Sequence, residues 1–545
     1  MSKNLLKGFV HSVLIVSLVC CSAVLMALAF PWNDHEWLGW IGLVPFFIAL
    51  CGRKPVTGYL LSFLWVVVFY PTLGPWLFNI RGYSLLHHAV FDFYLGFVWG
   101  PFGLFFCLVA RKWGASLALA AAPFLWVTFE FLRSNLGFMA FPWGMIAHSQ
   151  YLNIPVIQIA SVFGTYSVSF LLVTANSAIA AFILYLVGCS GKLRPLVASS
   201  VSKRGMMFIS IPAVIFITTA YVFGNAAISN TPAGRQISVA VVQGDIEQKN
   251  KWDPKLARAI MQTYTELTEK ASENRPDLIV WPEAATPWSI TQAPQLYQEI
   301  RRIARNANAS LLLGSSSHVK FKKGQPQKRT YQNSAFLIGP TKGNTRQQYD
   351  KMVLLPFGEY LPMKDKIPWS AINIPDPGSF LPGKDYALFN GPTGRIGVAI
   401  CWESIFPEHV RQLVRRGAQF VVNISNEAWF GKTAAPYQML SMNVFRAVEN
   451  KVFVVRCSNT GVSCFIDSNG RVLKRVQDVT GDDLFVSGTA TENVTLLNSS
   501  TFYTRHGEFL PYVCIVFSIL FVAGGYLSVS IRPLAANLPH RNHKV

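Results

Sequence analysis

Three short motifs place chemically reactive groups after stretches whose residues are typical of buried strands. Glu283 comes just after Leu278–Trp281, and Cys401 comes directly after Gly397–Ile400. Lys351 lies in a third motif between them in the chain. In α/β folds, reactive groups are exposed at the ends of strands. A thiol, a carboxylate and an ammonium group in these places are the set needed for nucleophilic attack on a carbonyl carbon.

Each of these groups has a definite task in such an attack. A free thiol is largely protonated at neutral pH, so Cys401 needs a base, and we expect Glu283 to accept its proton. Lys351, together with the backbone N–H of Trp402, would stabilise the oxyanion of a tetrahedral intermediate. Glu359 would hold Lys351 or the base in position. Each residue by itself is more often packing, a helix cap or a surface charge, and the prediction depends on their conjunction.

The composition indicates that these groups belong to a membrane protein. Of the 545 residues, 51% are apolar and only 14% are charged, and the mean hydropathy is +0.32. Soluble domains carry about 25% charged residues. The net charge of +20 is therefore better explained by an anionic membrane surface than by nucleic acid. The nine cysteines show no spacing typical of a zinc site or a disulfide framework, so we expect neither a metal nor a cofactor.

Apolar stretches divide the chain into membrane segments and one long insert. A spanning helix needs about 20 mostly apolar residues. Eight candidate segments are Phe9–Phe30, Trp37–Leu50, Thr57–Phe78, Ala89–Ala110, Ala115–Leu132, Ser161–Gly188, Met207–Gly224 and Phe509–Ile531. Trp37–Leu50 is short and either spans or forms a re-entrant segment. The predicted domains are residues 1–228 (membrane), 229–494 (insert) and 495–545 (a last helix at about 509–531 and a tail).

The placement of basic residues predicts how the chain is oriented, because cytoplasmic loops are enriched in Lys and Arg. One set of alternate loops holds Lys3, Lys7, Arg53, Lys54, Arg111, Lys112, Lys192, Arg194, Lys203, Arg204 and Arg532. The opposite set holds only Arg81 and Arg133 before the insert. Both termini are therefore expected in the cytoplasm and the insert outside. This alternation requires that Trp37–Leu50 carries the chain across.

The insert is predicted to be an α/β domain. Amphipathic helices are expected from Leu256 to Ala271, from Leu296 to Ala307, and around Val410 and Val444. Strands are expected at Ile237–Gln243, Leu278–Trp281, Leu311–Leu313, Ile396–Ile400, Phe420–Ile424 and Val452–Val455. A hairpin is expected where Ser468-Asn469-Gly470 separates Val462–Ile466 from Val472–Leu473.

The three motifs with their flanks resemble a known family. Glu283, Lys351 and Cys401 are similar to the Glu-Lys-Cys triad of the nitrilase superfamily, which implies an α-β-β-α sandwich. Together with the membrane segments, the chain resembles the bacterial apolipoprotein N-acyltransferases. The stretches that carry this resemblance are WPEAA at 281–285, YDKMVLLPFGEYLP at 349–362, CWESIFPE at 401–408, NISNEAWFG at 423–431 and FPWG at 141–144.

The resemblance implies further site residues and a reaction. Supporting or substrate-binding roles are implied for Glu359, Trp402, Glu403, Trp252, Trp429 and Phe430. Trp402 departs from the family's usual Tyr, and Glu427 stands where the family often has Asp.

The implied reaction is a ping-pong acyl transfer in the bacterial inner membrane, with the catalytic domain on the periplasmic side. An acyl chain would pass from a phospholipid, phosphatidylethanolamine by resemblance, through a Cys401 thioester to the N-terminal amine of a diacylglyceryl-cysteine lipoprotein. One alternative is a membrane-anchored amidase acting on a small amide, which gives no reason for so many spans. The other is a transporter or binding protein with a degenerate outer domain.

Overall fold

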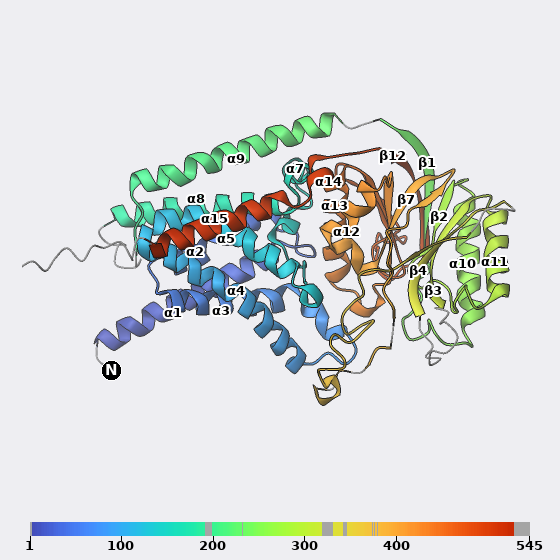
Figure 1. The fold of residues 1–545 in the computed structure, drawn as a ribbon, viewed down its shortest axis with the longest axis horizontal. Coiled ribbons are helices and arrows are strands. Elements are labelled where there is room, and N and C mark those ends of the chain that lie inside the picture. The colour runs from blue at the N-terminus through green and yellow to red at the C-terminus, as the bar shows by residue number, and fades with distance from the viewer. Residues whose placement is uncertain are drawn as a thin grey trace, which may run out of the picture.

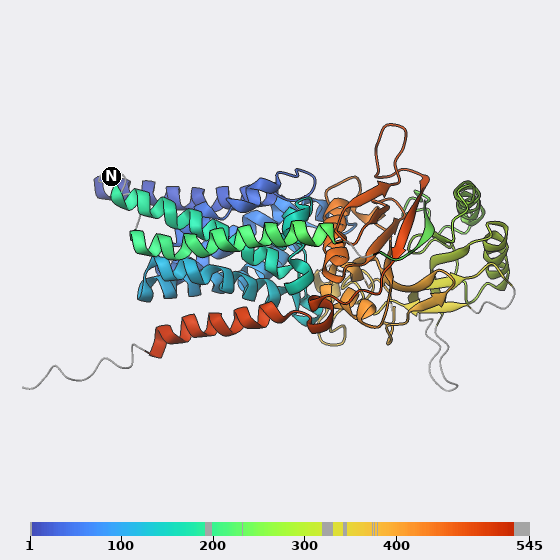
Figure 2. The ribbon, with the colours of Figure 1, turned by 90° about the horizontal axis from the view of Figure 1, so that it is seen from above.

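The computed structural model describes residues 3–190, 199–230, 233–318, 331–341, 346–372, 374, 376–378 and 380–527. A long bundle of helices forms one part of the molecule, and an α/β part is mounted on one end of it (Figure 1). The view from above shows the helices running side by side toward the α/β part (Figure 2). The N-terminus lies at the opposite end of the bundle (Figure 1).

Six helices of the described chain are long and apolar enough to cross a membrane. They are α1 (Lys3–Leu28), α3 (Pro55–Leu73), α4 (Leu85–Trp113), α5 (Ala115–Ser134), α8 (Tyr166–Cys189) and α9 (Lys203–Ser229). The shorter apolar helix α15 (Phe509–Leu527) packs against α5 and α4 after the α/β part. The predicted end of this last segment at Ile531 lies outside the described residues, as do Lys192, Arg194 and Arg532.

Two predicted segments are wrong at one boundary. The segment predicted to run to Phe78 ends at Leu73, where Gly74-Pro75 interrupts it and the 3₁₀ turn η2 (Pro75–Asn79) follows. The segment predicted from Ser161 begins instead with two short turns of helix, α6 (Ile154–Ile157) and α7 (Ala160–Phe163). Gly164 then breaks the helix with a φ of 74°. A side chain there would collide with the ring of Tyr503, so the break leaves room for an aromatic residue from the far end of the chain.

The short segment predicted at Trp37–Leu50 is not one continuous helix. It consists of the 3₁₀ turn η1 (Glu36–Trp40) and the helix α2 (Val44–Leu50). It nevertheless runs antiparallel to α1 over most of its length. Ser22 Oγ donates a hydrogen bond to the carbonyl of Gly42 at 2.6 Å, and Arg53 Nη2 lies 2.9 Å from His11 Nε2. The segment thus returns the chain to the starting end of α1, as the charge alternation requires.

A side chain from α8 fills the gap in this interrupted segment. Asn176 Oδ1 accepts a hydrogen bond from Leu43 N at 2.8 Å, and its Nδ2 donates to Gly39 O at 2.9 Å. Buried backbone groups without a partner are costly in an apolar environment. Asn176 therefore supplies the hydrogen bonds that a regular helix would make internally.

The α/β part contains two six-stranded sheets that face each other. The first has the order β12-β1-β2-β3-β4-β5, and the second has the order β11-β10-β9-β8-β7-β6. The strands of the first are β1 (Arg235–Gln243), β2 (Leu278–Val280), β3 (Ser310–His318), β4 (Tyr331–Ile338), β5 (Gln347–Asp350) and β12 (Gly488–Leu496). Those of the second are β6 (Phe389–Gly391), β7 (Gly394–Ile400), β8 (Phe420–Ser425), β9 (Phe453–Ser458), β10 (Cys464–Ile466) and β11 (Val472–Arg475).

Helices cover the outer face of each sheet, which confirms the predicted α-β-β-α sandwich (Figure 1). The helices on the first sheet are α10 (Ala257–Ser272) and α11 (Pro294–Asn306), and those on the second are α12 (Pro407–Arg415) and α13 (Ala435–Asn450). Strand β1 shows how alternation builds these layers. Val239 and Val241 join the apolar core between the sheets, whereas Ala240 and Val242 join the core under α10 and α11.

Helix α13 connects the α/β part to the membrane bundle. All of its residues except Tyr437 are buried, and its apolar side chains share one core with those of α1, α3, α5 and α8. Gln438 Oε1 accepts hydrogen bonds from the indole N–H groups of Trp76 at 3.1 Å and Trp143 at 2.7 Å, and its Nε2 donates to Leu73 O at 2.9 Å. The FPWG stretch therefore belongs to this joint.

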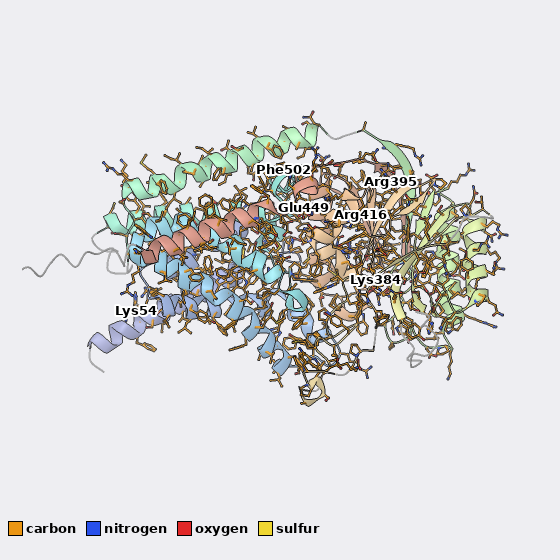
Figure 3. All side chains as sticks on the ribbon, viewed as in Figure 1. Lys54, Lys384, Arg395, Arg416, Glu449 and Phe502 are labelled. Atoms are coloured by element: carbon orange, nitrogen blue, oxygen red, sulfur yellow. The ribbon has the colours of Figure 1, made fainter. Side chains whose placement is uncertain are left out.

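A second contact at the same joint involves an acid on α13. Glu449 Oε1 accepts from Thr165 N at 3.0 Å and from Thr165 Oγ1 at 2.6 Å. Glu449 lies where the bundle meets the α/β part (Figure 3). The joint is thus both apolar and hydrogen-bonded, and it fixes the two sheets to the end of the bundle. The remaining short elements are η3 (Gly137–Met139), η4 (Ile146–Gln150), η6 (Trp369–Ile372), η7 (Cys401–Ile405), η8 (Ala428–Phe430) and α14 (Phe502–His506).

Candidate active site

The three residues predicted to do chemistry follow the ends of β2, β5 and β7 and influence one another electrostatically. Glu283 comes after β2, Lys351 directly after β5, and Cys401 directly after β7. The ammonium of Lys351 lies 3.6 Å from Glu283 Oε1, and the charges of both act on the thiol of Cys401. Glu283 and Lys351 are buried, and Cys401 is partly exposed. The structure therefore brings together residues that lie far apart in the sequence.

The carboxylate of Glu283 is held by amide donors. Asn333 Nδ2, from β4, donates to its Oε1 at 2.7 Å, and the backbone N–H of Asn426 donates to its Oε2 at 2.9 Å. Gly314 on β3 packs against the backbone of Glu283, and a Cβ atom at Gly314 would lie 2.6 Å from Glu283 Cα. The carboxylate of Glu283 is thus fixed in place by two N–H donors.

Lys351 is shared between two carboxylates. Its Nζ lies 3.0 Å from Glu359 Oε1 and 2.9 Å from Glu359 Oε2, in addition to its contact with Glu283. Burial alone would lower the pKa of Lys351, but the negative charges of Glu359 and Glu283 raise it above its ordinary value. Lys351 is therefore a permanent cation.

Glu359 is anchored from several sides. It accepts hydrogen bonds from Leu355 N at 2.7 Å and from Asn333 Nδ2 at 3.0 Å. Burial would raise the pKa of Glu359, but the ammonium of Lys351 and these hydrogen bonds hold it below its ordinary value. Asn333 thus links Glu359 and Glu283 through one amide group, and Glu359 positions the lysine.

Cys401 stands at a sharp turn between β7 and the 3₁₀ turn η7. Its φ is 54°, a left-handed conformation that is uncommon for a residue with a side chain. Its carbonyl accepts hydrogen bonds from Ser404 Oγ at 3.2 Å and from Asn423 Nδ2 at 3.1 Å, which hold this backbone in place.

The thiol of Cys401 is strongly protonated at rest. Burial first, and then the negative charge of Glu283, raise its pKa to about 12, although the ammonium of Lys351 opposes this. A preformed thiolate is therefore not the resting state. The thiol must lose its proton to a base as it attacks, which is the role that the sequence predicts for Glu283.

Glu403 connects the cysteine motif to the lysine motif instead of contacting the triad. Its carboxylate accepts from the backbone N–H groups of Ile400 at 2.7 Å, Met352 at 2.6 Å and Val353 at 3.0 Å, and from Tyr349 OH at 3.0 Å. It is completely buried. Glu403 therefore sets the distance between the loop after β5 and the turn after β7.

An apolar cavity of about 450 Å³ opens beside the cysteine turn. It is lined on one side by Phe138 of the membrane part and on the other by Trp402, Leu354, Pro356 and Phe406, among others. Trp402 packs edge-on against Phe406, with ring centroids 5.0 Å apart. The cavity is therefore walled by both parts of the molecule.

The other predicted supporting residues, Phe430, Trp429 and Trp252, differ in how far they are exposed to solvent. Phe430 packs edge-on against Trp76 with ring centroids 5.0 Å apart, and its carbonyl accepts a hydrogen bond from Asn79 Nδ2 at 2.9 Å, so this residue is docked on the bundle. Its neighbour Trp429 is half-exposed. Trp252 is 51% exposed, and the structure places it on the surface instead of among the triad.

Four site residues were not predicted. Asn333, Asn423 and Asn426 hold the triad through amide donors, and Lys251 reaches the backbone of Glu283. Asn423 and Asn426 lie inside the NISNEAWFG stretch, where the alternation of amides with apolar residues was the available signal. Nothing in the sequence around Asn333 gives such a signal, because this residue lies in the first, polar residues of a strand, which are common in any sheet. Glu427 of the same stretch is buried and forms an ion pair with Arg456.

The fold and the site together define the class of protein. A two-sheet sandwich with a glutamate, a lysine and a cysteine after its strands, joined to membrane-length helices, is a membrane-anchored member of the carbon-nitrogen hydrolase, or nitrilase, superfamily. Residues 238–487 match the carbon-nitrogen hydrolase family. Residues 22–178 match the N-terminal domain of apolipoprotein N-acyltransferase.

Relatives cover nearly the whole chain. The apolipoprotein N-acyltransferase of Geobacter metallireducens is 34% identical over 530 residues, which cover 94% of this chain and 95% of the relative. That of Chlorobaculum tepidum is 28% identical over 524 residues, which cover 91% of this chain and 93% of the relative. The chain therefore belongs to the apolipoprotein N-acyltransferase family and is an acyltransferase built on the fold of a carbon-nitrogen hydrolase. The family resemblance predicted from the sequence motifs is confirmed.

Proposed function

We propose that the protein transfers an acyl chain from a membrane phospholipid, through a thioester on Cys401, to the N-terminal amine of a diacylglyceryl-cysteine apolipoprotein. The observation that carries this proposal is the apolar cavity beside Cys401, which is walled by both the catalytic sandwich and the membrane part. Exposing an acyl chain to water costs about 0.8 kcal/mol per CH₂ group. A cavity at this boundary lets the ester reach the thiol while its chain stays in an apolar environment.

In the first half-reaction, Cys401 Sγ attacks the ester carbonyl carbon. The thiol proton passes to Glu283 as the S–C bond forms, because the high pKa of Cys401 requires a base at that moment. The tetrahedral oxyanion is stabilised by Lys351 and by the backbone N–H of Trp402. The C–O bond then breaks, the leaving lysophospholipid oxygen takes the proton from Glu283, and an acyl thioester remains.

In the second half-reaction, the lipoprotein amine attacks the thioester carbonyl. An N–C bond forms, Glu283 accepts one proton from the amine, and the S–C bond breaks. Cys401 leaves as a thiolate and regains its proton from Glu283, which returns the site to its starting state. Water must be kept from the thioester between the two steps, and the apolar walls of the cavity beside the cysteine turn support this exclusion.

The proposal also covers the phospholipid that donates the acyl chain and the orientation of the protein in the membrane. By resemblance, phosphatidylethanolamine is the donor. Lys54 lies at the end of the bundle away from the α/β part (Figure 3). Because cytoplasmic loops are rich in Lys and Arg, this supports a catalytic domain on the periplasmic side of the inner membrane with both termini in the cytoplasm.

Intact-mass measurement of the purified protein tests the proposal. Incubation with phosphatidylethanolamine and no acceptor is expected to add one acyl chain in a bond that hydroxylamine cleaves. Cys401→Ala is expected to abolish this adduct, and Cys457→Ala, which removes a buried thiol from strand β9 of the same sheet, to retain it. A diacylated lipopeptide should then take the chain on its amine. An unmodified wild-type protein that is folded, or an acyl group released only to water, would overturn the proposal.

A further inference from the structure

A second lysine is buried at the active site, on the loop between β1 and α10. Lys251 is only 1% exposed, and its Nζ donates a hydrogen bond to the backbone carbonyl of Glu283 at 3.1 Å. Lys249, two residues earlier on the same loop, has a side chain that is 79% exposed and pairs with Glu247 at 2.8 Å. The loop thus turns one lysine to solvent and the other to the base of the triad.

Lys251 is a buried cation without a carboxylate of its own. In the described part of the chain, no acidic side chain lies within ion-pairing distance of its Nζ, whereas Lys351 is shared by Glu283 and Glu359. A buried charge without a counter-ion is costly and needs compensation from its surroundings. Two carboxylates and one lysine carry a net charge of −1, and Lys251 brings this group to zero.

We propose that Lys251 is a second cation of the active site, which positions Glu283 through its carbonyl and offsets the excess negative charge as Cys401 is acylated. This inference rests on the proposed thioester chemistry. The backbone just after Glu283 is unusual, since Ala284 has a φ of 48°. A hydrogen bond to the carbonyl that precedes this residue restrains the turn and therefore the direction of the carboxylate.

The charge of Lys251 also affects the chemistry directly. Its ammonium attracts negative charge both on Glu283 and on the sulfur of Cys401, so this charge stays compensated as it passes from the base to the reacting groups. Lys251 acts together with Lys351, which already forms ion pairs with two carboxylates. Loss of Lys251 is therefore expected to slow the acylation step more than it affects folding.

The protonation of Lys251 falls in a range that can be measured. Burial lowers its pKa to about 8, against the opposing negative charges of Glu283 and Cys401. The other charged groups around the base are Lys351 and Glu359, and Glu283 also acts electrostatically on Glu427, which pairs with Arg456. Lys251 is thus charged at neutral pH and neutral above about 8.

The test is the rate of thioester formation from phosphatidylethanolamine, followed by quenched intact mass between pH 6.5 and 9.5. Lys251→Met is expected to slow acylation on the order of 10²-fold. This is the lower end of the rate loss seen when one preorganised group that stabilises transition-state charge is removed. Lys251→Arg keeps the cation at every pH used. The ratio of the wild-type rate to the Lys251→Arg rate should therefore fall about tenfold between pH 7 and pH 9. Lys249→Met removes a lysine from the same loop and should leave the rate unchanged.

Each outcome decides between two claims. A wild-type protein that forms no thioester would overturn the proposed function and this inference with it. Thioester formation at equal rates in Lys251→Met and Lys249→Met, with the same pH profile, would overturn the inference alone. If Lys251→Met fails to fold, the ratio of wild type to Lys251→Arg still decides, because a ratio that does not change through pH 8 contradicts the role of the charge.

Discussion

Replacing Glu403 by glutamine is the most direct test of how the active site is assembled. The carboxylate of Glu403 accepts hydrogen bonds from the backbone of both the lysine motif and the cysteine motif. The N–H groups of Met352 and Val353 donate to one oxygen, and the N–H group of Ile400 donates to the other. A glutamine has only one acceptor oxygen. In Glu403→Gln, the amide NH₂ must face one of these N–H donors, so at least one buried backbone donor loses its partner.

The size of the effect follows from these bonds. A hydrogen bond to a charged group contributes about 1.5–3 kcal/mol, and a buried donor without a partner costs about 1–3 kcal/mol. Glu403→Gln is therefore expected to destabilise the catalytic domain by about 3 kcal/mol, because one bond is lost and the others lose their charge. For a domain of this size, such a loss lowers the unfolding midpoint by about 6–12 °C.

The catalytic effect is expected to exceed what instability alone would produce. Lys351 and Cys401 lie on the two segments that Glu403 joins, and a displacement of about 1 Å can cost about 10²-fold in rate. Thermal unfolding in detergent and thioester formation at 20 °C below the midpoint would be measured side by side. Glu408→Gln is the matched control, since Glu408 is half-exposed and a glutamine keeps one acceptor oxygen for Arg411.

Two results would refute this reasoning. If Glu403→Gln unfolds at the same temperature as Glu408→Gln, the carboxylate does not carry the bonds ascribed to it. If it is destabilised but forms the thioester at the wild-type rate, Glu403 stabilises the fold without setting the distance between the two motifs.

Three further predictions concern the charges and the joint. Glu283→Gln should speed alkylation of Cys401 by iodoacetamide several-fold at pH 8–9, because loss of the negative charge lowers the thiol pKa, while acyl transfer falls by about 10²-fold or more as the base is lost. Burial would raise the pKa of Glu359 on folding, but the ammonium of Lys351 outweighs this and the pKa of the folded protein is lower than the ordinary 4.5. The ionised carboxylate therefore stabilises the fold above pH 4.5, and this stability is lost as the pH falls through the lower folded value. In acid unfolding curves, Glu359→Gln should show a weaker dependence on pH below 4.5. Gln438→Leu leaves two indole N–H groups without an acceptor, at about 1–3 kcal/mol each, and should increase hydrogen exchange in α13.

Matched variants separate these effects from general damage. Glu266→Gln changes an exposed acid on α10 and should alter neither the alkylation rate nor the acid limb of unfolding. Gln412→Leu changes a glutamine on α12 and should leave exchange in α13 as it is. Slower alkylation in Glu283→Gln, an unchanged acid limb in Glu359→Gln, or unchanged exchange in Gln438→Leu would each contradict the corresponding prediction.

Much of the architecture was readable without coordinates, because periodicity and apolar length are local properties of a chain. The alternation at Ile237–Gln243 and the helical spacing from Leu256 to Ala271 predicted β1 and α10 to within two residues at each end. The membrane helices were readable for the same reason, except where Gly74-Pro75 and Gly164 end them. The three motifs also predicted which residues meet, since the residue types and their order are properties of the sequence itself.

Other features depend on contacts between distant segments, and only the tertiary structure decided them. Lys251 and Trp252 are adjacent in an irregular loop, where no periodicity says which side chain is buried, and the folded chain buries the lysine and exposes the tryptophan. Asn333 holds two carboxylates from a strand with no distinctive pattern. The crossing at Trp37–Leu50 works without a continuous helix because Asn176 of α8 supplies the missing hydrogen bonds.

The division between what the sequence predicted and what the tertiary structure decided has a physical cause. Hydrophobic periodicity is set by the backbone geometry of single elements, so the sequence by itself determined that this chain has membrane helices and an α/β insert with a Glu-Lys-Cys set after its strands. The two-sheet sandwich was implied by the family resemblance of the motifs. The protonation of the Cys401 thiol and the charge balance around Lys351 depend on burial and on the charge of Glu283, which lies far from both in the sequence. Those interactions exist only once the sheets have packed face to face and α13 has docked on the bundle.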